Sequence, residues 1–182
     1  IKRREQTVPK LYFSYAAMNA GKSTLLLQAA HNYRERGMDT LLLVSAIDTR
    51  TREGEIASRI GVAREAEIFD QHDDLFAFIK ERLEGRKIAC IFIDEAQWIQ
   101  ESQVWQLARV TDRLKIPVLC YGLRTDFRGD LFPGSATLLA AEINIHISYR
   151  VVWPHEAFPV LAVYVDEPET EAAPLLTSDK AA

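Results

Sequence analysis

Ala16-Ala17-Met18-Asn19-Ala20-Gly21-Lys22-Ser23-Thr24 is the stretch of this sequence that decides its fold. The apolar run Leu11-Tyr12-Phe13-Ser14-Tyr15 before it predicts a strand, and residues 23–36 after it predict a helix. A strand, a tight loop with Lys and Ser, and a helix make up a phosphate-binding loop, in which backbone N–H groups and the helix N-terminus surround the phosphates. Lys22 is then expected to reach the β- and γ-phosphates of a nucleotide, and Ser23 to place its hydroxyl on Mg²⁺.

The loop departs from the usual pattern at its first position. That position is usually Gly, and here it is Ala16. Because Ala lacks the freedom of Gly at positive φ, we expect the chain to enter the loop with ordinary backbone angles. A plain Gly-Lys-Ser sequence at the start of an ordinary helix remains the alternative, but the strand and the helix lie on the correct sides for phosphate binding.

The composition is that of a single soluble domain with a sizeable core. The chain has 182 residues, of which 48% are hydrophobic and 26% charged. Its net charge of −4 argues against broad nucleic-acid binding, and no apolar run approaches a membrane span in length. No signal peptide is expected, since the basic residues at 2–4 are not followed by an apolar segment. The two cysteines, Cys90 and Cys120, lie in apolar runs and are expected to be buried thiols in a reducing, cytoplasmic compartment.

Apolar runs and helical segments alternate along the chain. Further strands are predicted at 40–44, 68–69, 88–94 and 116–121, and further helices at 73–84 and 103–114. This alternation predicts an α/β fold with a mostly parallel central sheet flanked by helices. Ligands of such sheets bind beyond the carboxyl ends of the strands. The phosphate loop, Asp48, Asp94 and the segment after Tyr121 all follow predicted strand ends, so we expect them to form one site.

Asp94 and Glu95 follow the most apolar of the predicted strands. An Asp in this position typically contacts the Mg²⁺ shell of a bound nucleotide, and the adjacent carboxylate can act as a base. The alternative is a solvated strand end that caps the next helix. Helicases carry similar sequences, but they need two nucleotide-binding lobes and a basic channel, and this acidic chain has room for one lobe.

Two more segments carry candidate ligand-binding residues. Asp48 can join the water shell of a metal, and Arg50 can neutralise charge on a transferring phosphoryl group, although a plain hydrophilic loop would look the same. The segment 123–134 mixes two Phe and two Arg with turn-forming residues. Aromatic and guanidinium groups near a phosphate site suit a planar ligand that can be phosphorylated. The alternative is a loop that buries its two Phe in the core.

Six motifs in this sequence resemble those of one family. They are residues 17–24, 32–37, 48–50, 58–61, 94–97 and 121–129. Together they make residues 10–142 similar to the bacterial thymidine kinases of the type II class. The resemblance implies a RecA-like P-loop NTPase fold of the α/β class. It also implies transfer of the γ-phosphate of ATP to the 5′-hydroxyl of thymidine or deoxyuridine in deoxynucleoside salvage, with Mg²⁺ as cofactor and commonly in a homotetramer.

The resemblance assigns roles to individual residues. Glu95 is the implied base for the 5′-hydroxyl proton and Arg128 the implied charge clamp. Asp48 and Arg50 match positions near phosphate and metal, and Ser23 and Asp94 match the Mg²⁺ positions. The implied ATP-binding residues are Ala16, Ala17, Met18, Asn19, Ala20, Gly21, Lys22, Ser23, Thr24, Asp94, Glu95, Ala96 and Gln97. The implied thymine-pocket residues are Met18, Trp98, Leu123, Phe127 and Phe132, and Trp98 stands where the family has Phe.

The resemblance ends near Glu142. The family continues into a zinc domain held by paired cysteines and a lasso that closes over the nucleoside. Residues after 142 contain no cysteine, and His146 and His155 alone cannot make a four-ligand site, so zinc is not expected and this domain is expected to be absent or degenerate. We therefore expect a flexible leader at 1–9, a kinase domain at 10–142, a divergent segment with short strands at 143–165 and a disordered tail at 166–182.

Three functions remain open from the sequence. They are an active thymidine kinase, an ATP-binding remnant of that family without the lasso, and a different P-loop kinase with another acceptor. Phe127 and Phe132 favour thymidine over another acceptor. The tail reflects either a frameshifted gene or true divergence.

Overall fold

The computed structural model describes residues 10–48 and 54–141, together with the backbone of four short strands at 144–149, 152–153, 156–157 and 161–164. The expected leader at 1–9, the tail at 166–182 and Arg50 lie outside the described residues. None of the helices in the described part of the chain is long and apolar enough to cross a membrane.

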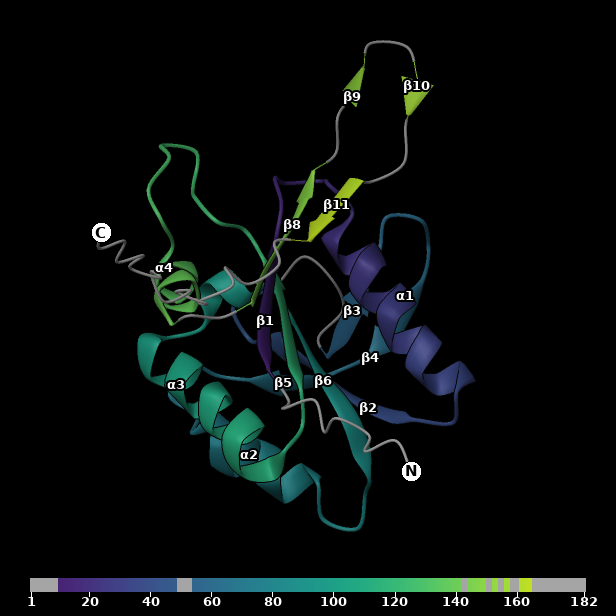
Figure 1. The fold of residues 1–182 in the computed structure, drawn as a ribbon, viewed down its shortest axis with the longest axis vertical. Helices are drawn as coiled ribbons and strands as arrows, with labels where there is room; N and C mark the ends of the chain where they lie inside the picture. Colours follow the sequence, from purple (N-terminus) through teal and green to yellow (C-terminus); the bar gives the residue numbers. More distant parts are fainter. Residues whose placement is uncertain are drawn as a thin grey trace, which may run out of the picture.

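A seven-stranded sheet forms the centre of the molecule, in the order β11-β8-β1-β7-β6-β2-β5 (Figure 1). Its strands are β1 (Leu11–Tyr15), β2 (Asp39–Ser45), β5 (Glu67–Phe69), β6 (Ile88–Asp94), β7 (Val118–Gly122), β8 (Asn144–Tyr149) and β11 (Leu161–Tyr164). All neighbouring strands pair in parallel except β11, which is antiparallel to β8. The predicted α/β fold with a mostly parallel sheet is confirmed.

Side-chain hydrogen bonds define where two of the helices begin. They are α1 (Lys22–Glu35), α2 (Leu75–Arg82), α3 (Glu101–Arg109) and α4 (Pro133–Ala140), with a 3₁₀ turn at Ala96–Trp98 and a π-helical turn at Val110–Leu114. The carboxylate of Asp74 accepts a 3.0 Å hydrogen bond from the N–H of Ala77 and so caps the start of α2. At α3 the side chain of Gln103 accepts a 3.0 Å hydrogen bond from the N–H of Gln100, so this helix begins before the predicted residue 103.

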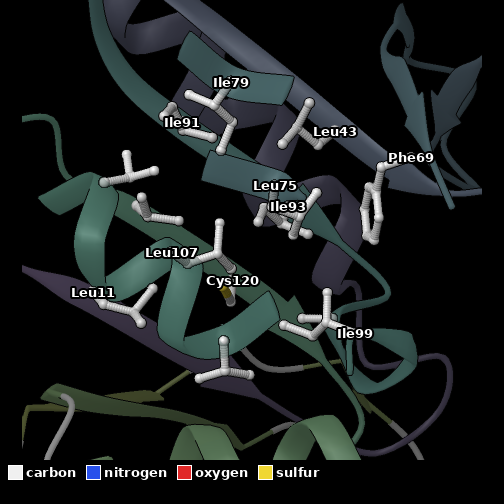
Figure 2. Packing of buried hydrophobic residues seen from close by; sticks show 14 of the residues in the cluster. Leu11, Leu43, Phe69, Leu75, Ile79, Ile91, Ile93, Ile99, Leu107 and Cys120 are labelled. Atoms are coloured by element: carbon white, nitrogen blue, oxygen red, sulfur yellow. The ribbon is translucent and has the colours of Figure 1, made fainter. Parts of the chain in front are cut away.

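Helices cover the two faces of the sheet unequally. Helix α1 packs on one face, and α2, α3 and α4 pack on the other (Figure 1). Along β6, Phe92 belongs to the cluster with α1, whereas Ile91 and Ile93 belong to the cluster with α2 and α3 that Figure 2 shows. All three side chains are fully buried. Burial on both faces explains why this strand is a continuous apolar run rather than an alternating one.

The two thiols lie in this core as predicted. Cys90 on β6 and Cys120 on β7 are both buried and both free. Burial raises the pKa of the Cys90 thiol to about 12 and raises that of Cys120 as well. Both groups are therefore neutral thiols at physiological pH and act as small apolar core side chains.

Some elements were not predicted from the sequence. Strands β3 (Glu55–Ala57) and β4 (Ala63–Glu65) form an antiparallel hairpin outside the main sheet. Helix α4 begins at Pro133, inside the segment 123–134 for which the sequence predicts a loop. The short strands expected in the tail exist, but β8 extends the main sheet beside β1 and β11 pairs with β8, so they do not need a core of their own. The two-residue strands β9 (Val152–Trp153) and β10 (Glu156–Ala157) pair with each other.

Helix α4 approaches the 3₁₀ turn closely because residue 134 is Gly. A Cβ added at Gly134 would lie 2.5 Å from the carbonyl oxygen of Ile99 and 2.8 Å from that of Ala96. We expect Gly134→Ala to lower the free energy of unfolding by about 1–3 kcal/mol, because backbone atoms must move to admit the methyl group. Urea denaturation of the two proteins measures this difference.

Ala140→Ser, at the exposed end of the same helix, is the control and should change the free energy of unfolding by less than about 0.5 kcal/mol. An unchanged stability in Gly134→Ala would mean that α4 can move away from the turn without loss.

Candidate active site

The loop between β1 and α1 has the backbone of an anion-binding turn. Asn19 and Gly21 adopt positive φ angles of 64° and 84°, and α1 begins at the next residue, Lys22. Asn and Gly are the residues that take this conformation with least strain. Ala16 is not among the described residues with positive φ, so the expected entry into the loop with ordinary angles is confirmed. The substitution of the usual first Gly by Ala therefore leaves the loop intact.

Lys22 lies across this loop. Its side chain is almost buried, with 8% of its surface exposed. The ammonium Nζ donates hydrogen bonds to the carbonyl oxygens of Ala17 at 3.0 Å and Ala16 at 3.3 Å. These contacts fix the positive charge on the inner side of the loop, at the place where loop N–H groups and the helix N-terminus also favour anions.

Ser23 and Asp94 bring the first turn of α1 to the end of β6. The hydroxyl of Ser23 donates a 2.7 Å hydrogen bond to Oδ2 of Asp94, which is 3% exposed. Mg²⁺ prefers oxygen ligands and usually takes only one or two from the protein when it binds a nucleotide. The hydroxyl oxygen of Ser23 and the carboxylate of Asp94 fit such an ion as ligands. The part of the chain that the structure describes has no group of three or more His, Cys, Asp or Glu that could hold a metal.

Glu95 follows directly in an unusual backbone conformation. Its φ is 51°, in the left-handed region, and its side chain is 4% exposed. The N–H of Glu95 donates to Oδ1 of Asp94 at 3.1 Å, and its Oε2 accepts from Nε2 of Gln97 at 2.5 Å. A non-Gly residue in this region costs about 1–3 kcal/mol, and such strain concentrates at functional sites. The sequence did not predict this turn, in which the neighbouring Ala96 is fully buried.

A cavity of about 530 Å³ brings these groups together. It is lined by Asn19 and residues 21–24 of the loop and α1, by Asp48, Asp94 and Glu95 at strand ends, and by residues 56–60 of the β3–β4 hairpin. The predicted meeting of the phosphate loop with Asp48 and Asp94 is confirmed. The segment after Tyr121, which was predicted to join them, does not line this cavity. The alternative of a solvated strand end is wrong for Asp94, which is 3% exposed.

Sequence reasoning gave no role to the hairpin wall of this cavity. The turn of the hairpin is closed by a 2.7 Å hydrogen bond from the N–H of Ser58 to the carbonyl of Val62, and Gly61 has a φ of 83°. Arg59 in this turn lines the cavity together with residues of the phosphate loop. The only signal in the sequence was the motif 58–61 among those that carry the family resemblance.

Three of the five predicted thymine-pocket residues lie close together, whereas Met18 and Phe127 are exposed, at 68% and 91%. Trp98 and Phe132 form an edge-to-face pair with ring centroids 5.3 Å apart. Leu123 lies at the end of β7, where its N–H donates to Oε1 of Gln97 at 2.9 Å and its carbonyl accepts from the hydroxyl of Ser135 at 2.5 Å. These three predicted residues therefore lie around the turn that follows Glu95.

Phe127 and the predicted charge clamp Arg128 lie next to each other on an exposed turn. Phe127 is 91% exposed, and the guanidinium of Arg128 lies 5.2 Å from its ring centroid. The carboxylate of Asp126 holds this turn by accepting from the N–H groups of Arg128 at 2.8 Å and Asp130 at 3.0 Å. Neither side chain lines the cavity. The alternative that both Phe of the segment fill the core is wrong for Phe127.

Comparison with known proteins identifies the family. The family model described as thymidine kinase matches residues 9–149. The chain belongs to the thymidine kinase family. It is 65% identical over 131 residues to the thymidine kinase of Ruegeria pomeroyi, 62% over 131 residues to that of a Jannaschia species and 65% over 134 residues to that of Rhizobium meliloti. Each match covers 72% of this chain and 66%, 67% and 68% of the three relatives respectively, so the chain spans about two thirds of their length.

The range matched by the thymidine kinase model contains every described part of the site. It includes the phosphate loop, the strand ends with Asp48 and Asp94, the hairpin and the segment 123–132, and it runs on through β8. The resemblance predicted from the motifs is thus confirmed, and the matched range extends seven residues beyond 142, the predicted end of the resemblance.

Proposed function

We propose that this chain is a thymidine kinase that transfers the γ-phosphate of ATP to the 5′-hydroxyl of thymidine or deoxyuridine. The observation that carries the proposal is the convergence of Lys22, the Ser23–Asp94 pair and Glu95 on one cavity, in a chain of the thymidine kinase family. Phosphoryl transfer needs mainly positioning and charge stabilisation, and these groups supply both.

The reaction follows from the placement of these groups. The loop N–H groups and the Lys22 ammonium bind the β- and γ-phosphates. The Ser23 hydroxyl and the Asp94 carboxylate would hold Mg²⁺, which supplies neutralisation of phosphate charge. The 5′-oxygen forms a bond to the γ-phosphorus while the bond from that phosphorus to the β–γ bridging oxygen breaks, and ADP leaves. Glu95 accepts the proton of the 5′-hydroxyl. Asp48, which lines the same cavity, would help to hold the water shell of the Mg²⁺.

The nucleoside site is proposed beside this centre. Met18 at the loop, Leu123 and the Trp98–Phe132 pair offer apolar surface for a thymine ring. Phe127 and Arg128 would complete the site as aromatic wall and charge clamp after movement of the exposed turn toward the cavity. The remaining predicted ATP contacts, from Ala16 to Thr24 and from Asp94 to Ala96, stay part of the proposal. Gln97 does not, because both ends of its amide bond within the protein.

Several wider properties rest on the family resemblance or on composition. The proposal includes a homotetramer in the cytoplasm, with neither nucleic acid nor membrane as partner. It includes no structural zinc, because the two cysteines of the chain lie in β6 and β7. The kinase domain is proposed at 10–142 and the divergent segment at 143–165.

The decisive assay measures ADP release and formation of thymidine 5′-monophosphate with and without thymidine, alongside ATP binding by calorimetry. Thymidine-dependent turnover supports the proposed function. Binding of ATP without turnover would instead indicate an ATP-binding remnant of the family. Turnover that needs a different hydroxyl acceptor would identify another P-loop kinase.

Arg59 provides a prediction about the hairpin wall. Because Arg59 lines the same cavity as the phosphate loop, we expect its guanidinium to donate hydrogen bonds to ATP phosphate oxygens. Replacing Arg59 by Gln should raise the KM for ATP about fivefold and leave kcat within about twofold, as loss of one exposed charged hydrogen bond implies. Steady-state kinetics with ATP as the varied substrate measures this effect.

Arg64→Gln is the matched control, since Arg64 lies on β4 of the same hairpin but does not line this cavity. Equal KM values for ATP in the two variants would show that Arg59 makes no contact with the nucleotide.

A further inference from the structure

Gln97 occupies a position in the site that its predicted role as an ATP contact does not explain. Its side chain is 2% exposed, on the 3₁₀ turn that follows Glu95. Both ends of its amide are engaged within the protein, with Nε2 donating to Oε2 of Glu95 at 2.5 Å and Oε1 accepting from the N–H of Leu123 at 2.9 Å. Gln97 does not line the cavity that holds the phosphate loop. Its amide therefore connects two parts of the site instead of facing a ligand.

The orientation of this amide follows from the chemistry of its neighbours. The backbone N–H of Leu123 can only donate, so the amide oxygen must face it. The amide NH₂ is then left to donate to Oε2 of Glu95. Exchange of the amide oxygen and nitrogen would break both contacts at once. The contacts with Leu123 and with Glu95 therefore favour the same orientation of the Gln97 amide.

The end of β7 is shaped around Gln97. A Cβ added at Gly122 would lie 2.8 Å from Oε1 of Gln97 and 3.0 Å from its backbone nitrogen. A real Cβ does not approach a neighbour this closely, so any larger residue at 122 would displace the Gln97 amide. The absence of a side chain at Gly122 thus allows Gln97 to reach across from the β6 turn to the β7 end.

We propose that Gln97 is a positioning residue that fixes the carboxylate of Glu95 and ties it to the Leu123 backbone beside the nucleoside site. The inference rests on the proposed function, in which Glu95 is the base. Glu95 has a strained backbone, and its carboxylate needs an anchor to point at a 5′-hydroxyl in one fixed orientation. An amide neither gains nor loses a proton near neutral pH, so Gln97 can hold Oε2 without competing for the proton of the substrate. Misplacement of a reacting group by about 1 Å can cost about 10²-fold in rate, which gives this anchor a measurable role.

The primary test compares Gln97→Met with Gln103→Met. Both glutamines are nearly fully buried and hold two elements together, but Gln103 bonds to Asp70, Asp73 and Gln100, outside the cavity. Gln97→Met is expected to lower kcat about 10²-fold while the Kd of ATP stays within about twofold. Gln103→Met is expected to lower the midpoint of thermal unfolding without this loss of kcat. A rise in the Kd of ATP with unchanged kcat in Gln97→Met would show instead that Gln97 is a nucleotide contact.

Gly122→Ala tests the same arrangement from the other strand. Its methyl group should push the Gln97 amide away, so kcat should fall while ATP affinity is kept. An unchanged kcat in both Gly122→Ala and Gln97→Met would overturn the inference.

Combination with Glu95→Gln separates this inference from the proposed function. If Gln97 acts through Glu95, adding Gln97→Met to Glu95→Gln should lower kcat no further, and the two effects should be strongly non-additive. A double variant whose fold loss in kcat equals the product of the two single losses would contradict a role of Gln97 through Glu95. Full activity in Glu95→Gln would defeat the base assignment itself, whereas loss in Glu95→Gln with full activity in Gln97→Met would defeat only the positioning role. A wild-type chain without thymidine turnover would overturn both.

Discussion

Replacing Glu95 by Gln is expected to reduce kcat for thymidine phosphorylation about 10³-fold, within the range of about 10²–10⁴ typical of a positioned general base. The variant keeps the size of the side chain and an oxygen that can accept from Nε2 of Gln97, so the buried turn should keep its shape. What it loses is the ability to take the proton from the 5′-hydroxyl. The affinity for ATP should remain within about twofold, because the proposed function assigns binding of the phosphates mainly to the loop and Lys22.

Single-turnover measurements at saturating ATP and thymidine isolate this chemical step from product release. Glu101→Gln is the matched control, since Glu101 is an exposed carboxylate at the start of α3 and should show the wild-type rate. A Glu95→Gln variant that keeps the wild-type single-turnover rate would show that another group, or water, takes the proton.

The strands of the central sheet could be predicted from the sequence because they are buried on both faces. Strand β6 is predicted at 88–94 and is observed at Ile88–Asp94. Ile88, Ile91 and Ile93 pack in one of the two core clusters and Cys90 and Phe92 in the other, which makes the run almost continuously apolar. The position of the site could be predicted for a related reason. In a parallel sheet the carboxyl ends of the strands share one edge, so Asp48, Asp94 and the phosphate loop had to meet there.

The hairpin and α4 could not be predicted by the same reasoning. Strands β3 and β4 have three residues each, and only Ile56 of these strands is buried. The sequence therefore shows no alternation of apolar and polar residues that would predict a strand. Helix α4 begins at Pro133 and carries Gly134, residues that indicate a turn in a sequence. Its Gly is required by close packing on the 3₁₀ turn, which is a tertiary contact.

The arrangement inside the site depends on contacts that sequence spacing does not carry. The bond from Gln97 to Leu123 joins residues 26 positions apart through a side chain and a backbone N–H. The left-handed backbone conformation of Glu95 could not be predicted from the sequence either, because residues other than Gly, Asn and Asp rarely adopt it. The exposure of Phe127 has a similar cause, since hydrogen bonds to Asp126 rather than apolar burial decide the shape of that turn.

Replacing Lys22 by Met is expected to weaken ATP binding about 10²-fold, because charged hydrogen bonds to phosphate contribute about 1.5–3 kcal/mol each. The turnover rate should fall further, since the same ammonium would neutralise charge that develops on the transferring phosphoryl group. Met fills most of the volume of the lysine stem, so the nearly buried site is not left with a cavity. Calorimetric titration with ATP and steady-state turnover measure the two losses separately.

Thermal unfolding distinguishes a binding role of Lys22 from a structural one. Without nucleotide the ammonium is almost buried, and two carbonyl oxygens, those of Ala16 and Ala17, accept hydrogen bonds from it. Because a partly desolvated charge is costly, its removal should leave the midpoint of unfolding unchanged or slightly higher. Saturating ATP should raise the midpoint of the wild-type chain and of Lys80→Met, an exposed control on α2, by linkage between binding and folding. At the same ATP concentration Lys22→Met should show little of this rise, and an equal rise in all three proteins would mean that Lys22 does not contact the phosphates.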